Sequence, residues 1–311
     1  MASLFRITFL GTGGSWPTPG RSMPSVLLQV DDIISLLDCG EGTQKQIMKS
    51  GVSFMKIKHV FLSHLHGDHF LGLIGLVQSM SFNGRTDELN IYGPPGCISI
   101  LSRAINVGYY TLRFPIRVHE LSFESSMEID GFMIHAMRAD HPVPAVSYRI
   151  MEKDLVKIDP EKAKKLGISS RRLEELRRKG SIDHDGKIIS LPDVYGGTRK
   201  GRTLIYSGDT RPNPKMVEFA KDADVFIHET STSSALEPKV NEFGHSSSRQ
   251  AAEIARDANV KKFYLYHYSP RIENTQELLS EAKNIFQESC LSIEGLSVEV
   301  EKGNIVIEKN L

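Results

Sequence analysis

The segment HLHGDH, residues 64–69, places three histidines and one aspartate within six positions, one residue after the apolar run VFL. His64 and His66 alternate as side chains do at the end of an extended segment, and a glycine then lets the backbone turn before Asp68 and His69. Neutral imidazoles and a carboxylate are good ligands for Zn²⁺ and related divalent ions. One such histidine could simply be exposed on a loop, but four converging ligand-type side chains predict a metal site.

Six positions cannot supply every ligand of two metal ions, so further ligands are expected at the ends of other strands. His141 lies just beyond the apolar run FMIHAM and precedes a proline. Asp209 closes TLIYSGD, where the preceding glycine again allows a sharp turn, and His267 closes KFYLYH. Each residue alone could be structural. Together they supply the number of ligands that a dinuclear site requires.

These candidates need strands to position them, and the chain has short apolar and β-branched runs bounded by Gly, Pro or Asp. We expect strands at 6–13, 25–30, 34–38, 59–63, 132–137, 146–150, 203–209, 224–229 and 262–267, with two more near 296–308. We expect helices at 41–49, 71–82, 246–258, after the cap-like GHSSS, and 274–286. This alternation predicts an α/β protein whose sheets are covered by helices.

One segment interrupts this pattern. Residues 151–202 hold fourteen Lys or Arg against nine Asp or Glu, a net charge of +5, although the whole chain has a formal net charge of zero. The segment shows almost no apolar periodicity that could fill a core. It is either a solvated helical surface or a basic arm that binds a polyanion by displacing counterions.

Composition sets broader limits. With 311 residues and 40% hydrophobic content, the chain can bury a large core, and its neutral total charge gives no expectation of nucleic-acid binding by itself. The start, MASLFRITFL, is too short in apolar residues for a signal peptide, and no apolar run approaches the length of a membrane span. We therefore expect a cytoplasmic protein that does not contact a membrane.

The sequence resembles the metallo-β-lactamase superfamily and, within it, the ribonuclease Z family of tRNA 3′-processing endoribonucleases. The resemblance is carried by FLGTGGSWP near the start, HLHGDH, the isolated His141, SGDT, HET at 228–230, GHSS at 244–247, YGPPG at 92–96 and LYHYSPR near the end. It implies an αβ/βα sandwich of two β-sheets flanked by helices. Residues 1–311 would form one catalytic domain, with a basic exosite arm inserted at 152–197.

The resemblance also implies which residues bind metal. It assigns one ion to His64, His66 and His141 and a second to Asp68, His69 and His267, with Asp209 bridging the two. Two Zn²⁺ ions per subunit are expected, with Mn²⁺ as an alternative. Such a pair can hold a hydroxide that attacks a phosphodiester, with Asp68 as general base.

Glu229 and His245 are the remaining catalytic candidates, again from the resemblance. The carboxylate would hold one nitrogen of the imidazole, so that the other can protonate the leaving oxygen or stabilise the scissile phosphate. Alternatively, Glu229 only ends a strand and His245 only precedes a helix. His228 is expected to support the site from behind.

The implied substrate is precursor tRNA, cut to leave a 3′-hydroxyl on the tRNA and a 5′-phosphomonoester on the trailer. A homodimer is expected, with no DNA partner. The arm would bind the RNA backbone without reading bases, using the following basic residues: Lys164, Lys165, Arg171, Arg172, Arg177 and Arg178.

Two alternatives remain open at this point. A hydrolase of small substrates with the same fold, such as a phosphodiesterase, would use the same ligands, and a metal-binding RNA module would perform no chemistry. The loop Pro17–Ser22 reads PTPGRS, whereas many family members have PxKxRN there, a motif associated with rejecting CCA-ended precursors. Whether this chain rejects them is left open.

Overall fold

Two β-sheets organise the chain, whose computed structural model describes residues 4–301 and 306–310. Most of it forms one compact unit, Met1–Met151 with Arg202–Leu311, and Glu152–Gly201 forms a second. Within the described residues, no helix is long and apolar enough to cross a membrane.

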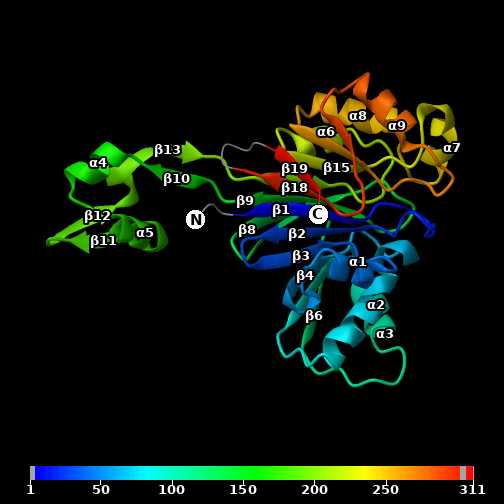
Figure 1. Ribbon diagram of the computed structural model, residues 1–311, viewed down its shortest axis with the longest axis horizontal. Helices are drawn as coiled ribbons and strands as arrows, with labels where there is room; N and C mark the ends of the chain where they lie inside the picture. Colours follow the sequence, from blue (N-terminus) through cyan, green and yellow to red (C-terminus); the bar gives the residue numbers. More distant parts are fainter. Residues whose placement is uncertain (1–3, 302–305, 311) are drawn as a thin grey trace. The chain divides into compact units, whose positions relative to one another are not determined.

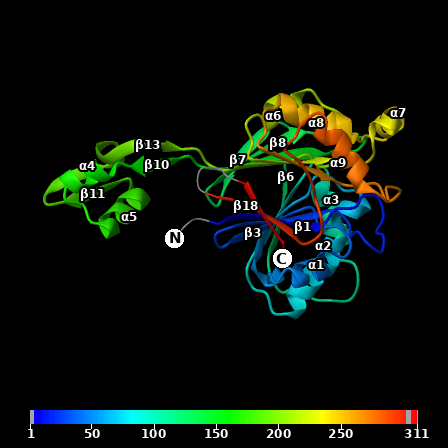
Figure 2. The same cartoon turned by 45° about the horizontal axis from the view of Figure 1, so that its top comes forward.

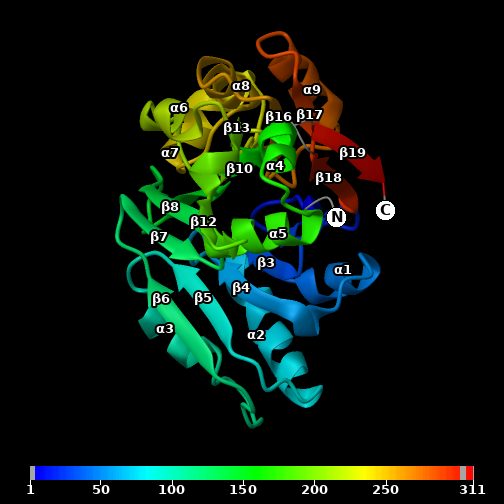
Figure 3. The same cartoon turned by 90° about the vertical axis from the view of Figure 1, so that its left-hand side faces the viewer.

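The first sheet has eight strands in the order β19-β18-β1-β2-β3-β4-β5-β6 among the described residues. The run from β3 to β6 is parallel and the other pairs are antiparallel, and Figure 3 shows β3 to β6 fanning out side by side. The strands are β1 Phe5–Gly11, β2 Ser25–Val30, β3 Ile33–Leu37, β4 Ile57–Phe61, β5 Leu89–Gly93, β6 Ile116–Glu120, β18 Leu296–Val300 and β19 Val306–Asn310.

The second sheet has seven strands in the order β17-β16-β15-β14-β9-β8-β7 in the described part of the chain. Strands β14 to β17 are parallel, so their carboxyl ends meet at one edge. The strands are β7 Ser125–Ile129, β8 Phe132–Arg138, β9 Val146–Glu152, β14 Thr203–Tyr206, β15 Val225–Glu229, β16 Lys262–Tyr266 and β17 Ser289–Leu291.

Helices cover the outer faces of both sheets (Figures 1 and 2). One group packs on the eight-stranded sheet: α1 Thr43–Lys49, α2 Gly67–Phe82 and α3 Cys97–Ala104. The other packs on the seven-stranded sheet: α6 Lys215–Ala220, α8 Ser248–Asp257 and α9 Thr275–Lys283, with the short α7 Glu237–Glu242 preceding α8.

Strand β2 shows why the runs are apolar on both sides. Val26, Leu28 and Val30 point into the core between the sheets, while Leu27 points into the core beneath the helices. A strand covered on both faces is expected to read as a continuous apolar run. The predicted α/β sandwich of two sheets flanked by helices is therefore confirmed.

The start of α2 differs from expectation. We expected the helix to begin at Leu71, where the apolar pattern becomes regular, but it begins at Gly67 with His66 as N-cap. Asp68 consequently lies in the first turn, where the helix dipole favours a negative charge. Helix α8, in contrast, begins near the predicted cap, because the Ser247 hydroxyl accepts from the Gln250 N–H at 3.1 Å.

The second unit, Glu152–Gly201, has its own fold. A ribbon of β10 Leu155–Ile158 and β13 Tyr195–Arg199 leads to α4 Pro160–Lys165, α5 Ser170–Lys179 and a hairpin of β11 Ser181–His184 and β12 Lys187–Ser190. Our expectation of almost no core here was wrong, since six side chains are buried together: Ala163, Ile168, Leu176, Ile182, Ile189 and Val194. The predicted arm, 152–197, ends four residues before this unit does.

Candidate metal centre

The predicted ligands lie just beyond the carboxyl ends of strands. His64 follows the end of β4 by three residues, Asp209 follows β14 by three, and His267 follows β16 directly. His141 lies three residues after β8. The edges of the two sheets thus bring together side chains that are far apart in the sequence.

A tight turn at Gly208 sets the direction of Asp209. Gly208 has φ +59°, and a Cβ built on it would lie 2.5 Å from Cβ of Ser63. Only glycine fits this combination of left-handed backbone and close approach. The predicted role of the glycine before Asp209 agrees with this geometry.

The first ligand group contains His64, His66 and His141, whose candidate ligand atoms all lie within 4.8 Å of one another. Nδ1 of His66 is 3.1 Å from Nε2 of His64 and 3.3 Å from Nε2 of His141. His64 is fully buried, whereas His66 is exposed. Three imidazole nitrogens therefore converge on one point.

The second group contains Asp68, His69 and His267 under the same distance limit. Nε2 of His69 and Nε2 of His267 are 3.2 Å apart, and Oδ2 of Asp68 lies 3.7 and 3.6 Å from them. The backbone of His267 adopts φ +60°, an uncommon conformation for a residue with a side chain, which directs the ring to this point.

Asp209 connects the two groups. Its Oδ2 is 3.7 Å from Nε2 of His64, and its Oδ1 is 3.4 Å from Nε2 of both His69 and His267. Oδ1 is buried and receives no hydrogen bond. A buried carboxylate oxygen is costly without a positively charged partner, so the donor set suits divalent cations on both sides of Asp209.

Hydrogen bonds behind the imidazoles leave the correct nitrogens facing this centre. Nδ1 of His69 donates to Asp38 Oδ2 at 2.7 Å, and Nδ1 of His141 donates to the Gly244 carbonyl at 2.9 Å. The Ser63 hydroxyl, which donates to Asp38, lies 3.0 Å from Nδ1 of His64 and accepts from it. With their hydrogens on Nδ1, these rings present Nε2 lone pairs in their neutral form, as metal ligands require.

Sequence reasoning missed Asp38. This fully buried carboxylate follows β3 and accepts hydrogen bonds from the Ser63 N–H, the Ser63 hydroxyl, His69 and the Tyr206 hydroxyl, at 2.6–2.7 Å. It fixes the ring of His69 from behind. The sequence carried a usable pattern, since Asp38 directly follows the apolar strand β3, much as Asp209 closely follows β14.

Electrostatics differ between the two groups. Burial, reinforced by the neighbouring charge of His69, lowers the pKa of His64, and burial lowers the pKa of His66 and His141. The first group is therefore held neutral, with lone pairs available. Burial also disfavours charge on His69, but the carboxylates around it, led by Asp209, raise the pKa of this imidazole.

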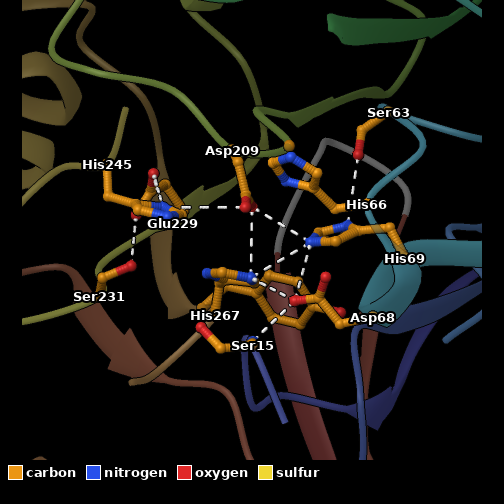
Figure 4. A network of polar contacts seen from close by, with 12 residues as sticks. Ser15, Ser63, His66, Asp68, His69, Asp209, Glu229, Ser231, His245 and His267 are labelled. Carbon is orange, nitrogen blue, oxygen red and sulfur yellow. Dashed lines mark hydrogen bonds and ion pairs between the residues drawn. The ribbon is translucent and has the colours of Figure 1, made fainter. Parts of the chain in front are cut away.

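Glu229 and His245 are brought together beside the ligands. Nδ1 of His245 lies 3.0 Å from Oε1 of Glu229, which also accepts the Thr210 N–H at 3.0 Å, while the Ser231 hydroxyl donates to Oε2 at 2.9 Å. Burial disfavours charge on His245, but Glu229 outweighs it and raises the pKa of His245 to about 9. Figure 4 shows Asp209 between this pair and the Asp68–His69 side of the centre.

His228 does not reach the ligand groups. Its Nδ1 interacts with the backbone carbonyl of Glu229 at 2.7 Å, and its ring packs edge-on against Phe226. We expected His228 to support the site from behind, and its described contact with the site is this one to the backbone carbonyl of Glu229. Its effect is limited to the backbone around Glu229.

The predicted RNA-binding residues lie on α4 and α5, in the second unit. Five are exposed and Arg172 is partly exposed, with an ion pair to Glu175 at 2.6 Å. The exposed residues are Lys164, Lys165, Arg171, Arg177 and Arg178.

Comparisons with known proteins bear on this arrangement. The family model of the anti-Pycsar protein Apyc1 matches residues 5–158, and that of the beta-lactamase superfamily domain matches residues 176–268. The ribonuclease Z of Thermoplasma acidophilum is 59% identical over 96% of this chain and 98% of its own length. The ribonuclease Z of Picrophilus torridus is 49% identical over 99% and 100%.

The chain belongs to the ribonuclease Z family. The predicted membership of this family and of the metallo-β-lactamase superfamily is thereby confirmed. Among solved structures, human tRNase Z, short form (ELAC1), matches with a TM-score of 0.67 and 26% identity, over 97% of this chain and 98% of that one. A diphosphatase from the PhnP family, at 18% identity and a TM-score of 0.65 over 96% and 98%, shares the fold with this ribonuclease Z family member.

Proposed function

We propose that this member of the ribonuclease Z family is an endoribonuclease that removes the 3′ trailer from precursor tRNA. The products would be a tRNA with a 3′-hydroxyl and a trailer with a 5′-phosphate. The observation that carries the proposal is the meeting of two ligand groups around Asp209, beside the Glu229–His245 pair. The names of the curated relatives and of the human tRNase Z support RNA, and tRNA in particular, as the substrate.

We assign one ion to His64, His66 and His141 and another to Asp68, His69 and His267, with Asp209 shared. Nitrogen-rich sets with carboxylates favour Zn²⁺, with Mn²⁺ as the alternative. When bound, such ions lower the pKa of water and offset negative charge on phosphate oxygens. The Nδ1 hydrogens behind His69 and His141 support this assignment, because Nε2 of each of these two rings is left as an acceptor.

Asp68 is assigned as the general base. Its Oδ2 accepts the Ser15 N–H at 2.7 Å, which fixes the carboxylate and leaves Oδ1 without a hydrogen bond from the described residues. Burial alone would raise the pKa of Asp68, but the neighbouring charge of His69 lowers it overall. An ionised, positioned carboxylate can orient a water molecule and accept its proton.

His245 is assigned as the group that protonates the leaving 3′-oxygen. Because Nδ1 faces Glu229 at 3.0 Å, Nε2 is the nitrogen left for substrate. Its side chain keeps 19% of its surface exposed, whereas that of Glu229 keeps 1%. The imidazole can therefore reach a bound phosphodiester, while the buried carboxylate holds the ring in place.

The basic unit 152–201 is assigned to the RNA backbone. Exposed Lys and Arg side chains on α4 and α5 match what backbone binding needs, since they can displace counterions from phosphates without reading bases. We also propose a homodimer that acts in the cytoplasm. The homodimer and the cytoplasmic location are supported by the family resemblance alone.

The test uses a precursor tRNA with a short trailer, with both product ends mapped. Wild-type protein loaded with Zn²⁺ should release the trailer as one 5′-phosphorylated fragment. Changing Lys164, Lys165, Arg177 and Arg178 to Glu should strongly reduce this cleavage and its salt dependence, yet leave hydrolysis of bis(p-nitrophenyl) phosphate intact. Changing the exposed Lys215 and Lys221 to Glu is the matched control.

Failure of the wild-type protein to release a trailer would overturn the proposed function. If the phosphodiester were hydrolysed but no precursor were cut, a small-substrate hydrolase would be the correct description. If both activities fell equally in the arm variant, the role given to the arm would be wrong.

A further inference from the structure

Trp16 is the chain's sole tryptophan, and 48% of its surface is exposed. It lies in the loop between β1 and β2, directly after Ser15, whose N–H donates to Oδ2 of Asp68 at 2.7 Å. A single exposed aromatic side chain is common on protein surfaces and needs no explanation. This one directly follows the residue that donates to the assigned general base, and its loop is held in place.

Several contacts fix the loop to the segment that follows β16. The Gly14 N–H donates to the Tyr268 carbonyl at 3.0 Å, and a Cβ on Gly14 would lie 2.4 Å from the ring of His267. Nη2 of Arg21 donates to the Ile272 carbonyl at 2.6 Å. The indole is therefore carried by backbone that is anchored to the metal centre, and little ordering remains to be done when a ligand binds.

Arg271 gives the indole a partner. Its guanidinium carbon lies 5.3 Å from the centre of the Trp16 ring, a cation–π arrangement. Arg271 is itself exposed. An indole supported by a guanidinium group, with surface still open to solvent, is the kind of platform on which unpaired nucleobases stack.

The position of the loop indicates which base it meets, if the proposed function holds. Figure 4 shows Ser15 at the Asp68 side of the centre, with His245 on the other side of Asp209. The leaving 3′-oxygen, near His245, belongs to the tRNA. The strand on the Asp68 side therefore belongs to the trailer.

We propose that Trp16, supported by Arg271, stacks on the first unpaired base of the trailer and so helps to position the scissile phosphate. The inference rests on the proposed function. Stacking tolerates any base, because every base has a π-face. Trp16 is thus a substrate-binding residue that accepts trailers of different sequence and requires that a base be present.

The first test compares Trp16→Ala and Trp16→Phe on a precursor with an intact trailer. The alanine variant should lower kcat/KM by roughly tenfold to a hundredfold, the range expected for one stacked base, and the phenylalanine variant should keep most of the activity. Metal content and thermal unfolding of both variants should match wild type. Phe82→Ala is the matched control, because Phe82 is 76% exposed at the far end of α2.

The second test removes the base instead of the indole. An abasic first trailer nucleotide should impair the wild-type protein as much as Trp16→Ala does, and the two changes together should cost no more than either alone. Because Trp16 is the only tryptophan, binding of the normal substrate should quench the indole fluorescence, and the abasic substrate should not.

Outcomes separate the two proposals. No trailer release by wild-type protein would refute the proposed function. Normal release combined with unimpaired Trp16→Ala would refute the stacking role alone. Coupling of Trp16 to an abasic site on the tRNA side of the cut would overturn the assignment to the trailer.

Discussion

Replacing Asp38 with asparagine tests whether the partners behind the imidazoles determine metal binding. Asp38 has φ +56°, a region that asparagine tolerates better than alanine, so Asp38→Asn preserves the backbone and the side-chain shape. What changes is one oxygen. If the amide NH₂ takes the place of Oδ2, it faces three groups that now donate to that atom: the Ser63 hydroxyl, the Tyr206 hydroxyl and Nδ1 of His69.

The three donors do not respond equally. A hydroxyl can rotate and accept a hydrogen bond from the amide, so Ser63 and Tyr206 can adapt. Nδ1 of His69 can accept only if its hydrogen moves to Nε2. That atom is the one that faces His267 at 3.2 Å and Asp209 at 3.4 Å, so the imidazole would lose the lone pair assigned to metal.

The expected magnitude follows from one buried donor that loses its acceptor, about 1–3 kcal/mol. Expressed as metal affinity, loss of the group that orients a ligand typically costs about 10–100-fold. The free-energy cost and the loss of metal affinity describe the same effect, so the two are not added together. We expect Zn²⁺ affinity to fall within that range, with a fall in precursor cleavage at limiting Zn²⁺ that excess Zn²⁺ partly restores.

The assay is competition for Zn²⁺ between the protein and a chelating dye, with thermal unfolding measured alongside. Asp130→Asn is a close control, because Asp130 also has a positive φ and its Oδ2 lies 3.0 Å from Nε2 of His59, which belongs to neither ligand group. The control should bind Zn²⁺ as wild type does. Wild-type affinity in Asp38→Asn would refute the argument that this carboxylate sets the tautomer of His69.

Three further predictions follow from individual contacts. Gly208→Ala would place a Cβ 2.5 Å from Cβ of Ser63 at a positive φ, so the thermal unfolding midpoint and the metal content should both fall. Gly295→Ala is the control for backbone strain alone, because Gly295 also has a positive φ but a Cβ there would meet nothing within 4 Å. Equal effects of the two substitutions would contradict a role for the clash with Ser63. Leu176→Ala should lower the stability of the second unit by about 2–5 kcal/mol, because Leu176 lies in its small core. This unit should then become sensitive to proteases and precursor cleavage should fall, while the Zn²⁺ content is unchanged. Leu166→Ala, at a position 38% exposed, should have a milder effect. Chelation should lower the melting temperature, because an ion at 100 times its Kd stabilises the fold by about 2.7 kcal/mol. A melting temperature that ignores both chelator and added Zn²⁺ would contradict the metal assignment.

Part of the candidate metal site could be predicted because several of its residues are close together in the sequence. His64, His66, Asp68 and His69 lie within six positions, where spacing alone indicates convergence. The more distant candidate ligands, such as Asp209, were proposed because each closely follows an apolar strand. The same rule fits Asp38, but we did not apply it there. A single carboxylate after a strand does not indicate that Ser63, His69 and Tyr206 will donate hydrogen bonds to it.

The limits of the fold prediction have a similar cause. The sequence analysis placed most strands of the two large sheets but none at β5, β6, β7 and β17. In β6, Ile116 and Val118 alternate with polar residues as a half-exposed strand does. Strand β6 lies at the edge of its sheet and is only partly buried, so its apolar content is low. In the second unit, a core of six residues drawn from four helices and strands and the turns beside them leaves no continuous pattern in any one segment.

The candidate metal site and the exposed surface that we assign to substrate binding depend on different kinds of contact. A metal centre built from short strand ends depends on close, buried contacts, such as those between Asp209 and the imidazoles, which tolerate few changes. The choice of substrate can depend on side chains that make few contacts within the protein, because exposed side chains such as Trp16 and Arg177 can contact a bound RNA. The candidate ligands therefore concern the chemical step, and the exposed loop and the basic unit are where we expect the proposed RNA substrate to bind.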